Sequence, residues 1–486
     1  MAKRTAIIDI GSNSVRMVIF EKTSRFAFHL LHEAKSRVRI SEDAYLHDGN
    51  LQEPAIERAL CALRDFLVIA DSYRVRKTLC VATSAVRDAP NRNRFLTRIK
   101  KTLGLTIKVI DGEKEAYLGG IASANLLPPL DGVTIDIGGG STECAYIEKG
   151  CVVQSHSLDL GTVRLKELFF DRGDISGATA HIDAALAELP ASAHAIGIGG
   201  TFRALARTLL KKSDHPLQKL HGYRFHAAAM HDYLDRILEA PNNSALKKLG
   251  IKKERYDVIR PGALILSRLL KRLGSDTLTA SGVGVREGVF LADLLRSSRH
   301  RFPEHFNPSM RCLLDRYDID PAHTRHIAGV AKNLFDLLHG ALGIPAHYRR
   351  ELSIAARLCK IGTALHYYSH HQHSYYLAQT ALEYGYSHET IMLVSTLVRF
   401  QKRKRPSKAH RDEFATLLPD ESVVRGLSLL LALADALLAH HPRMVDFTLE
   451  YDNGELVVRG KGAPLYLPQE QAAALEFPKG LGIRFS

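Results

Sequence analysis

The chain has 486 residues, more than one hydrophobic core usually supports, so about two to four domains are expected. Hydrophobic residues make up 45% of it and charged residues 24%, which excludes a largely disordered protein. The net charge of +14 favours an anionic partner, which could be a nucleic acid, a membrane surface or a polyphosphorylated compound.

The six cysteines show neither a C-x-x-C pair nor a framework spacing, so we expect no structural disulfides and no zinc site. No apolar run approaches the roughly 20 residues of a membrane-spanning helix. The N-terminus MAKRTAIIDIGSN turns polar after one short strand. We therefore predict a cytoplasmic protein with reduced thiols.

The first predicted elements form a β-hairpin. A β-branched run predicts a buried strand over residues 5–10, a turn of Gly, Ser and Asn follows, and a second strand covers residues 15–20. The next predicted elements are an extended stretch over 26–40, a helix over 54–71, and a strand followed by a loop over 75–88.

This hairpin is repeated later in the chain. IDIGSNSVRMVIFEK at 8–22 aligns without a gap with IDIGGGSTECAYIEK at 135–149, and about half of the positions are identical. The second copy again predicts a strand (133–137), a glycine-rich turn, an outgoing strand (143–147) and a third extended stretch (151–158). Two α/β halves with matching turns imply a cleft between them.

The two turns are predicted to bind phosphate. Consecutive backbone N–H groups of such a turn can converge on an anion, and glycine lets a phosphate approach without a Cβ in the way. An ordinary hairpin turn is the alternative, and the duplication argues against it. The predicted phosphate-binding residues are Gly11, Ser12, Asn13 and Ser14 in the first copy and Gly138, Gly139, Gly140, Ser141 and Thr142 in the second.

Carboxylates flank both turns. Asp9 and Asp136 lie at strand ends, where they would repel phosphate unless a hard cation or a positioned water lies between. This predicts a Mg²⁺ site, although Mn²⁺ could replace Mg²⁺. Glu143 could reach the same metal or water, and an exposed strand residue is the alternative for it.

A series of motifs resembles the exopolyphosphatase and guanosine pentaphosphate phosphohydrolase family. The motifs are DIGSNSVR (9–16), ATSAVRDAPN (82–91), DGEKEA (111–116), DIGGGSTE (136–143), LGTVRLKE (160–167), GIGGTFRALA (197–206) and SGVGVREGV (281–289). The family lies within the actin, sugar kinase and Hsp70 superfold. The resemblance implies an α/β fold with a duplicated actin-like, ribonuclease H-like core, in which domains 1–125 and 126–302 enclose a cleft.

The resemblance also implies individual roles. In the family the glutamate before the alanine of G-x-x-E-A activates the attacking water, which points to Glu115; the sequence alone does not favour Glu115 over Glu113, because EKE at a helix start is often a solvated face. Arg87 is expected to grip a phosphate, and a loop salt bridge is the alternative. Lesser candidates are Arg260, Thr162 and Arg164.

These features predict hydrolysis of a terminal phosphoanhydride with release of orthophosphate. The resemblance implies that the substrate is inorganic polyphosphate and that guanosine pentaphosphate could also be converted to tetraphosphate, with a role in the stringent response. An enzyme that acts primarily on guanosine pentaphosphate is the alternative. We expect neither nucleic acid nor a membrane as partner. Basic tracks that could grip a polymer, or be solvated faces, are 92–101, 247–255, 299–301 and 399–408. A catalytically dead sensor of polyphosphate or alarmone is the non-enzymatic alternative.

After a predicted linker at 296–309, helical patterns fill residues 303–442 and resemble the HD-type domain of longer family members. His326 and Asp435 match the outer metal ligands of that type, but Cys359-Lys360 replaces the central His-Asp pair, so no metal is expected there. The domain would extend the phosphate groove or form a homodimer contact. For the histidines His366, His370, His371 and His373, packing is favoured over a metal site.

The end of the chain, residues 443–486, is predicted to be a small β appendage. Alternating patterns predict strands within 447–460 and again over 463–471. Asp452-Asn453-Gly454 predicts the turn of a hairpin in the first of these segments.

Overall fold

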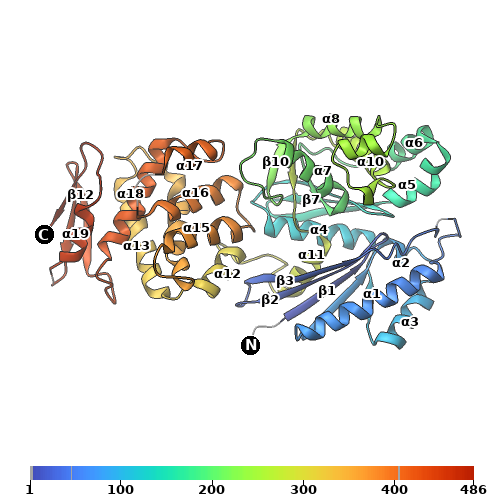
Figure 1. The fold of residues 1–486 in the computed structure, drawn as a ribbon, viewed down its shortest axis with the longest axis horizontal. Coiled ribbons are helices and arrows are strands. Elements are labelled where there is room, and N and C mark those ends of the chain that lie inside the picture. The colour runs from blue at the N-terminus through green and yellow to red at the C-terminus, as the bar shows by residue number, and fades with distance from the viewer. Residues whose placement is uncertain (1–3, 45, 403–405, 463) are drawn as a thin grey trace. The chain divides into compact units, whose positions relative to one another are not determined.

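The computed structural model describes residues 4–44, 46–402, 406–462 and 464–486. The chain folds into two compact units, Met1–Phe306 and Asn307–Ser486, and the boundary between them falls inside the predicted linker at 296–309 (Figure 1). Among the described residues, none of the helices combines the length and the apolar character needed to cross a membrane. Within that part of the chain all six cysteines are free thiols, as predicted.

The first sheet of unit 1 has the strand order β3-β2-β1-β4-β5. β1 pairs antiparallel with β2 and parallel with β4, so a hairpin continues into a parallel sheet. The predicted hairpin is confirmed, whereas residues 84–87 form a short helix where a loop was expected. The elements of this half are β1 (Arg4–Ile10), β2 (Val15–Lys22), β3 (Phe28–Ser36), α1 (Glu53–Ser72), β4 (Lys77–Ala82), α2 (Ser84–Arg87), α3 (Arg92–Leu103) and β5 (Ile107–Val109).

The second sheet repeats this arrangement with one more strand. Its order is β10-β11-β9-β6-β7-β8, with β6 antiparallel to β7 and parallel to β9, so the duplicated sequence folds into a duplicated structure. The strands are β6 (Gly132–Ile137), β7 (Thr142–Glu148), β8 (Cys151–Leu158), β9 (His194–Ile198), β10 (Tyr223–His226) and β11 (Thr277–Ala280). The helices of this half are α5 (Thr162–Leu168), α6 (Ile175–Leu186), α7 (Gly199–Lys212), α8 (Ala227–Leu238), α9 (Asn243–Lys248) and α10 (Ile259–Leu273).

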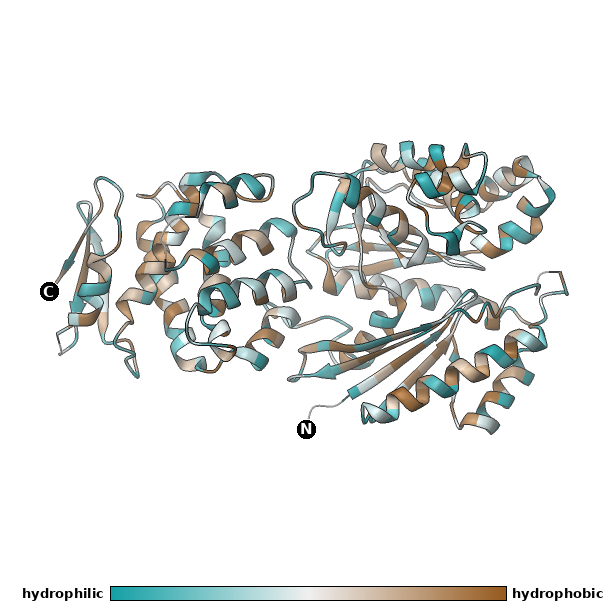
Figure 2. Cartoon of the chain, in the orientation of Figure 1, coloured by the Kyte–Doolittle hydropathy of each residue, from teal (hydrophilic) through white to brown (hydrophobic). Residues whose placement is uncertain are grey.

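Hydrophobic residues run along the central strands of both sheets, and the helices carry mixed hydrophobic and hydrophilic residues (Figure 2). One core lies between the first sheet and α1 with α3, and another between the second sheet and helices α6, α7, α8 and α10. Such amphipathic helices bury their apolar stripe against a sheet and leave the polar side to water.

Two helices, α4 (Gly112–Leu126) and α11 (Val285–Leu294), pack against each other between the sheets (Figure 1). α4 packs on β7 and β8 of the second sheet, and α11 contacts β1 of the first. The close approach needs glycine: a Cβ at Gly120 would lie 2.8 Å from the Cβ of Ala145, and one at Gly119 would lie 2.7 Å from Ile198. Glu115, on α4, therefore belongs mechanically to the second sheet.

Unit 2 is helical with a small sheet at its end. Its helices are α12 (Pro308–Tyr317), α13 (Pro321–Leu338), α14 (Arg349–Leu358), α15 (His370–Ala381), α16 (His388–Phe400), α17 (Lys408–Glu413) and α18 (Glu421–Leu437). The sheet has the order β12-β13-β14, from β12 (Phe447–Asp452), β13 (Glu455–Gly460) and β14 (Gly482–Phe485).

The predicted hairpin around Asp452-Asn453-Gly454 is confirmed. The strand predicted over 463–471 is wrong. Residue 463 lies outside the described residues, and Tyr466–Ala473 form helix α19, which packs on α18. Buried Pro468 and Ala472 are four residues apart, the spacing of a helix rather than of a strand.

Candidate active site

A polar pocket lies between the two halves of unit 1, and the two duplicated turns line it from opposite sides. Gly11, Ser12, Asn13 and Ser14 contribute from one turn, and Gly138, Gly139 and Ser141 from the other. The turns touch: a Cβ built on Gly139 would lie only 2.6 Å from the Cβ of Ser12. The structure thus brings together the two turns that the repeat predicted to face each other.

Both turns are closed by the same hydrogen bond. The N–H of Gly11 donates to the carbonyl of Ser14 (3.2 Å), and the N–H of Gly138 donates to the carbonyl of Ser141 (2.9 Å). In the second turn, amides at the start of α5 bind the carbonyls of Gly138 and Gly139. Because N–H and C=O point in opposite directions across a trans peptide, the following N–H groups point away from α5.

Three of the predicted phosphate-binding residues lie outside the pocket lining. Thr142 is fully buried and its Oγ1 donates to the carbonyl of Leu160 at 2.5 Å, so this hydroxyl supports the fold. Gly140 is buried behind the turn, against Gly161. Arg87 lies beside the pocket, where its Nη1 contacts the carboxylate of Glu115.

The four carboxylates predicted from the sequence line the same pocket, and Glu254 and Glu287 line it as well. Asp9 is the penultimate residue of β1, and Asp136 occupies the equivalent position of β6. Glu143 pairs with Asp136 across the β6–β7 hairpin, and Glu115 reaches in from the first turn of α4. Glu143 accepts a hydrogen bond from Ser157 Oγ at 3.0 Å. Glu143 is only 3% exposed, so the alternative of an exposed strand residue does not apply to it.

The crowded burial of these groups makes them hold protons strongly. Burial raises the pKa of Asp9 to about 6, against the lowering effect of Arg286 and Arg16. Burial also raises the pKa of Glu143 to about 8 and the pKa of Asp136. The pKa of Glu115 lies well above its usual value, first through burial and then through repulsion by Glu143 and the aspartates.

The chemistry of this donor set fits a hard divalent cation. Asp9, Asp136 and Glu143 offer carboxylate oxygens, and among the described residues Asp9 Oδ1 is buried without a hydrogen-bond partner. A cation would favour the charged forms of these carboxylates, which burial disfavours. Within the described part of the chain, however, no three acidic, histidine or cysteine side chains stand close enough to form a ready-made metal centre. The metal ligands therefore stay a prediction.

Sequence reasoning missed a set of arginines. Arg16, Arg203 and Arg286 line the pocket together with Lys35, Arg37 and Arg255. Arg203 donates from Nε to the carbonyl of Ser281 (2.8 Å), and Arg286 donates to Glu33 (2.8 Å). A signal was present: Arg16, Arg203 and Arg286 each close a glycine-rich motif, GSNSVR, GGTFR and GVGVR. Such arginines suit phosphate oxygens.

The three lesser candidates for phosphate binding occupy different places relative to the pocket. Thr162 lines the pocket. Arg164 lies at its edge, where it pairs with Asp88 and Asp159. Arg260 donates to the carbonyl of Ala240 at 2.6 Å and is not among the residues that line the pocket.

Of the basic tracks, the one at 247–255 contributes Arg255 to the pocket lining. In the track at 92–101, Arg94 and Arg98 form ion pairs with Glu53 and Glu57 on α1, as expected of a solvated face. In the track at 299–301, Arg301 donates to Cys151. Residues 403–405 of the track at 399–408 lie outside the described residues.

In unit 2 the HD-like positions contain an ion pair. Lys360 Nζ lies 2.7 and 2.8 Å from the two oxygens of Asp435, so an ammonium neutralises the aspartate that a cation would need. Burial and then Lys360 lower the pKa of nearby His370 to about 4. His366 contacts the carbonyl of Tyr368 at 3.4 Å. That this unit binds no metal stays a prediction.

The pKa of Glu143 predicts how stability depends on pH. Between pH 4.5, its usual pKa, and about pH 8, Glu143 keeps its proton in the folded protein and loses it in the unfolded chain. The stability present below pH 4.5 is therefore lost as pH rises through about 8. Without divalent cations, Glu143→Gln should therefore raise the melting temperature over wild type increasingly from about pH 5 to about pH 9. Glu148→Gln, at the exposed end of β7, is the matched control. A constant difference for Glu143→Gln would contradict the prediction.

The chain resembles proteins of one family over most of its length. Residues 18–297 match the profile of the Ppx/GppA phosphatase family, and residues 307–455 match the profile of domain III of Ppx/GppA phosphatases. A guanosine-5'-triphosphate,3'-diphosphate pyrophosphatase of Aeromonas hydrophila is 26% identical over 473 residues, which cover 93% of this chain and 91% of that protein. A bifunctional 3-dehydroquinate synthase/phosphatase of Fusobacterium nucleatum is 29% identical over 57% of this chain, and the match spans only 44% of that relative.

Solved structures agree with the sequence comparisons. The Ppx/GppA family member of Aquifex aeolicus matches with a TM-score of 0.54 and 29% identity, over 61% of this chain and 99% of that chain. An exopolyphosphatase from Cytophaga hutchinsonii matches with a TM-score of 0.53 and 25% identity, over 60% of this chain and 98% of that chain. The predicted fold class, a duplicated actin-like core with a helical part and a small sheet after it, is confirmed.

Proposed function

Because the chain belongs to the Ppx/GppA phosphatase family, we propose that it is an exopolyphosphatase that hydrolyses the terminal phosphoanhydride of inorganic polyphosphate and releases orthophosphate. Guanosine pentaphosphate, converted to tetraphosphate, is the second candidate substrate. It is favoured by the match to the Aeromonas hydrophila pyrophosphatase along nearly the whole chain. The observation that carries the proposal is the meeting of the two duplicated turns around a pocket that Asp9, Asp136, Glu143 and Glu115 line together.

The turns would bind neighbouring phosphates of one substrate. Amides after Gly11 and Gly138, with the hydroxyls of Ser12 and Ser141, would hold the terminal and penultimate groups, and Arg16, Arg203 and the other pocket arginines would neutralise their charge. This pocket is small and charged, which suits phosphate better than an apolar ligand.

Glu115 would act as the base. It would accept a proton from the water that attacks the terminal phosphorus in line, while the shortened chain leaves with the bridging oxygen. Asp9, Asp136 and Glu143 would hold Mg²⁺, or Mn²⁺, which supplies electrostatic stabilisation of the charge that develops on the phosphoryl oxygens. Arg87 would contribute one arm of its guanidinium to the terminal phosphate.

Other parts of the proposal concern the whole protein. We propose four domains, over residues 1–125, 126–302, 303–442 and 443–486. We also propose that the protein is a homodimer in the cytoplasm and takes part in the stringent response. The helical domain would lengthen the phosphate groove or form the dimer contact.

The test compares the two substrates directly. Orthophosphate release is measured from long-chain polyphosphate and from guanosine pentaphosphate, with Mg²⁺, across a salt series. We expect activity on the polymer to fall steeply with salt, because a polyanion on basic residues releases many counterions. Comparable salt dependence and faster turnover of the nucleotide would favour the second candidate. Tight binding of either compound without phosphate release would point instead to a sensor.

A further inference from the structure

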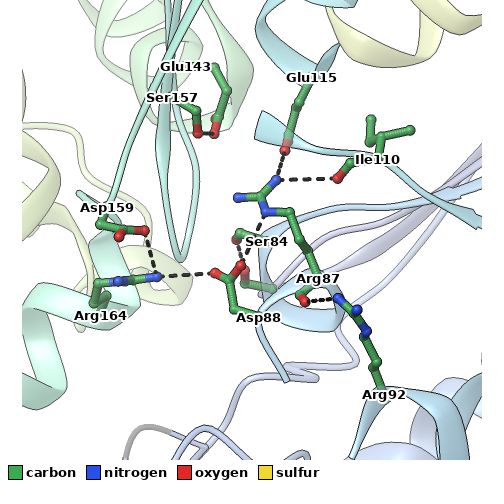
Figure 3. A network of polar contacts seen from close by, with 11 residues as sticks. Ser84, Arg87, Asp88, Arg92, Ile110, Glu115, Glu143, Ser157, Asp159 and Arg164 are labelled. Carbon is green, nitrogen blue, oxygen red and sulfur yellow. Dashed lines mark hydrogen bonds and ion pairs between the residues drawn. The ribbon is translucent and has the colours of Figure 1, made fainter. Parts of the chain in front are cut away.

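Asp88 lies between two arginines at the edge of the pocket (Figure 3). Its Oδ1 accepts a hydrogen bond from Arg87 Nε at 3.2 Å, and its Oδ2 accepts one from Arg164 Nη2 at 3.2 Å. Arg164 also contacts Asp159 at 3.1 Å, so Asp159 and Asp88 hold the same guanidinium from two sides. The family comparison and the proposed chemistry assign nothing to Asp88.

Arg87, the residue before Asp88, connects these contacts to Glu115. Arg87 donates from Nη1 to Glu115 Oε2 at 3.2 Å and, more weakly, to the carbonyl of Ile110 at 3.5 Å. Its backbone carbonyl accepts a hydrogen bond from Arg92 at 2.7 Å. Among the described residues, Nε and Nη1 of Arg87 have hydrogen-bond partners and Nη2 has none.

These contacts join the two halves of unit 1. Arg87 and Asp88 follow β4 of the first sheet, whereas Arg164 lies on α5 beside the second-sheet turn and Glu115 lies on α4, which packs on β7 and β8. The Arg87–Glu115 and Asp88–Arg164 pairs therefore both cross the cleft, and they start from consecutive residues.

We propose that Asp88 is a positioning residue that acts through Arg87. Arg164 holds Asp88 from the opposite half, and Asp88 fixes the Nε edge of Arg87, so that Nη1 faces Glu115 and Nη2 stays available to the terminal phosphate. The contact that joins the two halves of the cleft therefore also aligns Arg87. This inference rests on the proposed function, because it gives Arg87 and Glu115 their catalytic meaning.

The energetic reason is the freedom of an arginine side chain. An arginine side chain that no neighbour holds loses rotamer entropy when it binds a phosphate. Asp88 imposes that order before substrate binds, and the Arg87 side chain is already only 17% exposed. A misplacement of about 1 Å at a reacting group can cost roughly 100-fold in rate.

A second ion pair provides the matched control. Arg39 Nη2 lies 3.1 Å from Asp257 Oδ2, and this pair likewise joins the first half to the second. It is about as exposed as Asp88 (36% for Asp257 against 38% for Asp88), and no contact links it to Arg87 or Glu115. If cross-cleft ion pairs only hold the halves together, loss of either pair should have the same effect.

The experiment measures kcat and KM for orthophosphate release by Asp88→Asn, Arg164→Gln and Asp257→Asn, each alone and combined with Arg87→Ala. We expect Asp88→Asn and Arg164→Gln to lower kcat roughly 10- to 100-fold with a smaller change in KM. Asp257→Asn should change kcat by less than about twofold. In the Arg87→Ala background, Asp88→Asn should add almost nothing, because the residue through which it acts is gone.

Two results would overturn the inference: equal losses for Asp88→Asn and Asp257→Asn, or an undiminished loss for Asp88→Asn when Arg87 is already alanine. Melting temperatures of all variants show whether each one is folded. Should Asp88→Asn not fold, Arg164→Gln tests the same contact from the other half. A wild-type protein that releases no phosphate from either substrate would defeat the proposed function instead, so the two failures are distinguishable.

Discussion

Glu115→Gln is expected to lower kcat for orthophosphate release by roughly 100- to 10,000-fold, with KM little changed. The amide keeps the shape of the side chain but cannot accept the proton of the attacking water. Glu115 suits the role because it lines the pocket at 9% exposure, and burial and the neighbouring carboxylates raise its pKa. Steady-state kinetics with saturating polyphosphate measure the effect.

The matched control is Glu113→Gln. Glu113 lies in the same first turn of α4, is exposed, and has the same favourable interaction with the helix N-terminus. Its replacement should leave kcat nearly unchanged, which separates a loss of the base from a loss of helix stability. Equal effects of the two substitutions would remove Glu115 from the mechanism.

The pH profile gives an independent check on Glu115. A base acts only when it is unprotonated, so wild-type kcat/KM should fall as pH drops through the raised apparent pKa of the coupled carboxylates. In Glu115→Gln the residual activity should lose most of this acidic limb. An unchanged profile in the variant would assign the limb to Asp9, Asp136 or Glu143.

The duplicated hairpins could be predicted from the sequence because their information is local. Strand, turn and strand follow one another within 15 residues, and the alignment of 8–22 with 135–149 shows that both copies serve one purpose. Because the two hairpins are copies of each other, their turns were expected to face each other, and Ser12 and Gly139 do so. Family resemblance, and not spacing, selected Glu115 over Glu113.

The parts that were missed depend on packing between distant segments. Helix α4 is next in sequence to the first sheet, yet it packs on the second, because Gly119 and Gly120 allow close approach to Ala145 and Ile198. No local sequence pattern predicts that α4 packs on the second sheet. The hydroxyl of Thr142 likewise donates to a backbone carbonyl 18 residues away, so it is not available to a ligand in the pocket.

Gly139→Ala is expected to lower kcat/KM by roughly 100-fold, because it pushes the two turns apart. The new Cβ would lie 2.6 Å from the Cβ of Ser12 and 3.4 Å from Val163 Cγ2. Rotating a side chain does not relieve the first contact, since the Cβ of Ser12 is fixed to its backbone. One turn must move, and the spacing of two adjacent phosphates then no longer matches both sets of amides.

A compensating substitution identifies the cause. Ser12→Gly removes the atom that Gly139→Ala would strike, so the double variant should recover most of the lost kcat/KM, limited by the lost Ser12 hydroxyl and its 3.2 Å contact with Ser84. Ser12→Gly alone sets that limit. Gly329→Ala is the neutral control, because this glycine lies on α13 and, among the described residues, the new methyl group would meet nothing within 4 Å beyond the adjacent residues and backbone of its own helix. If Ser12→Gly restores nothing, the spacing between the turns does not govern phosphate binding, because the collision has been removed while the defect persists.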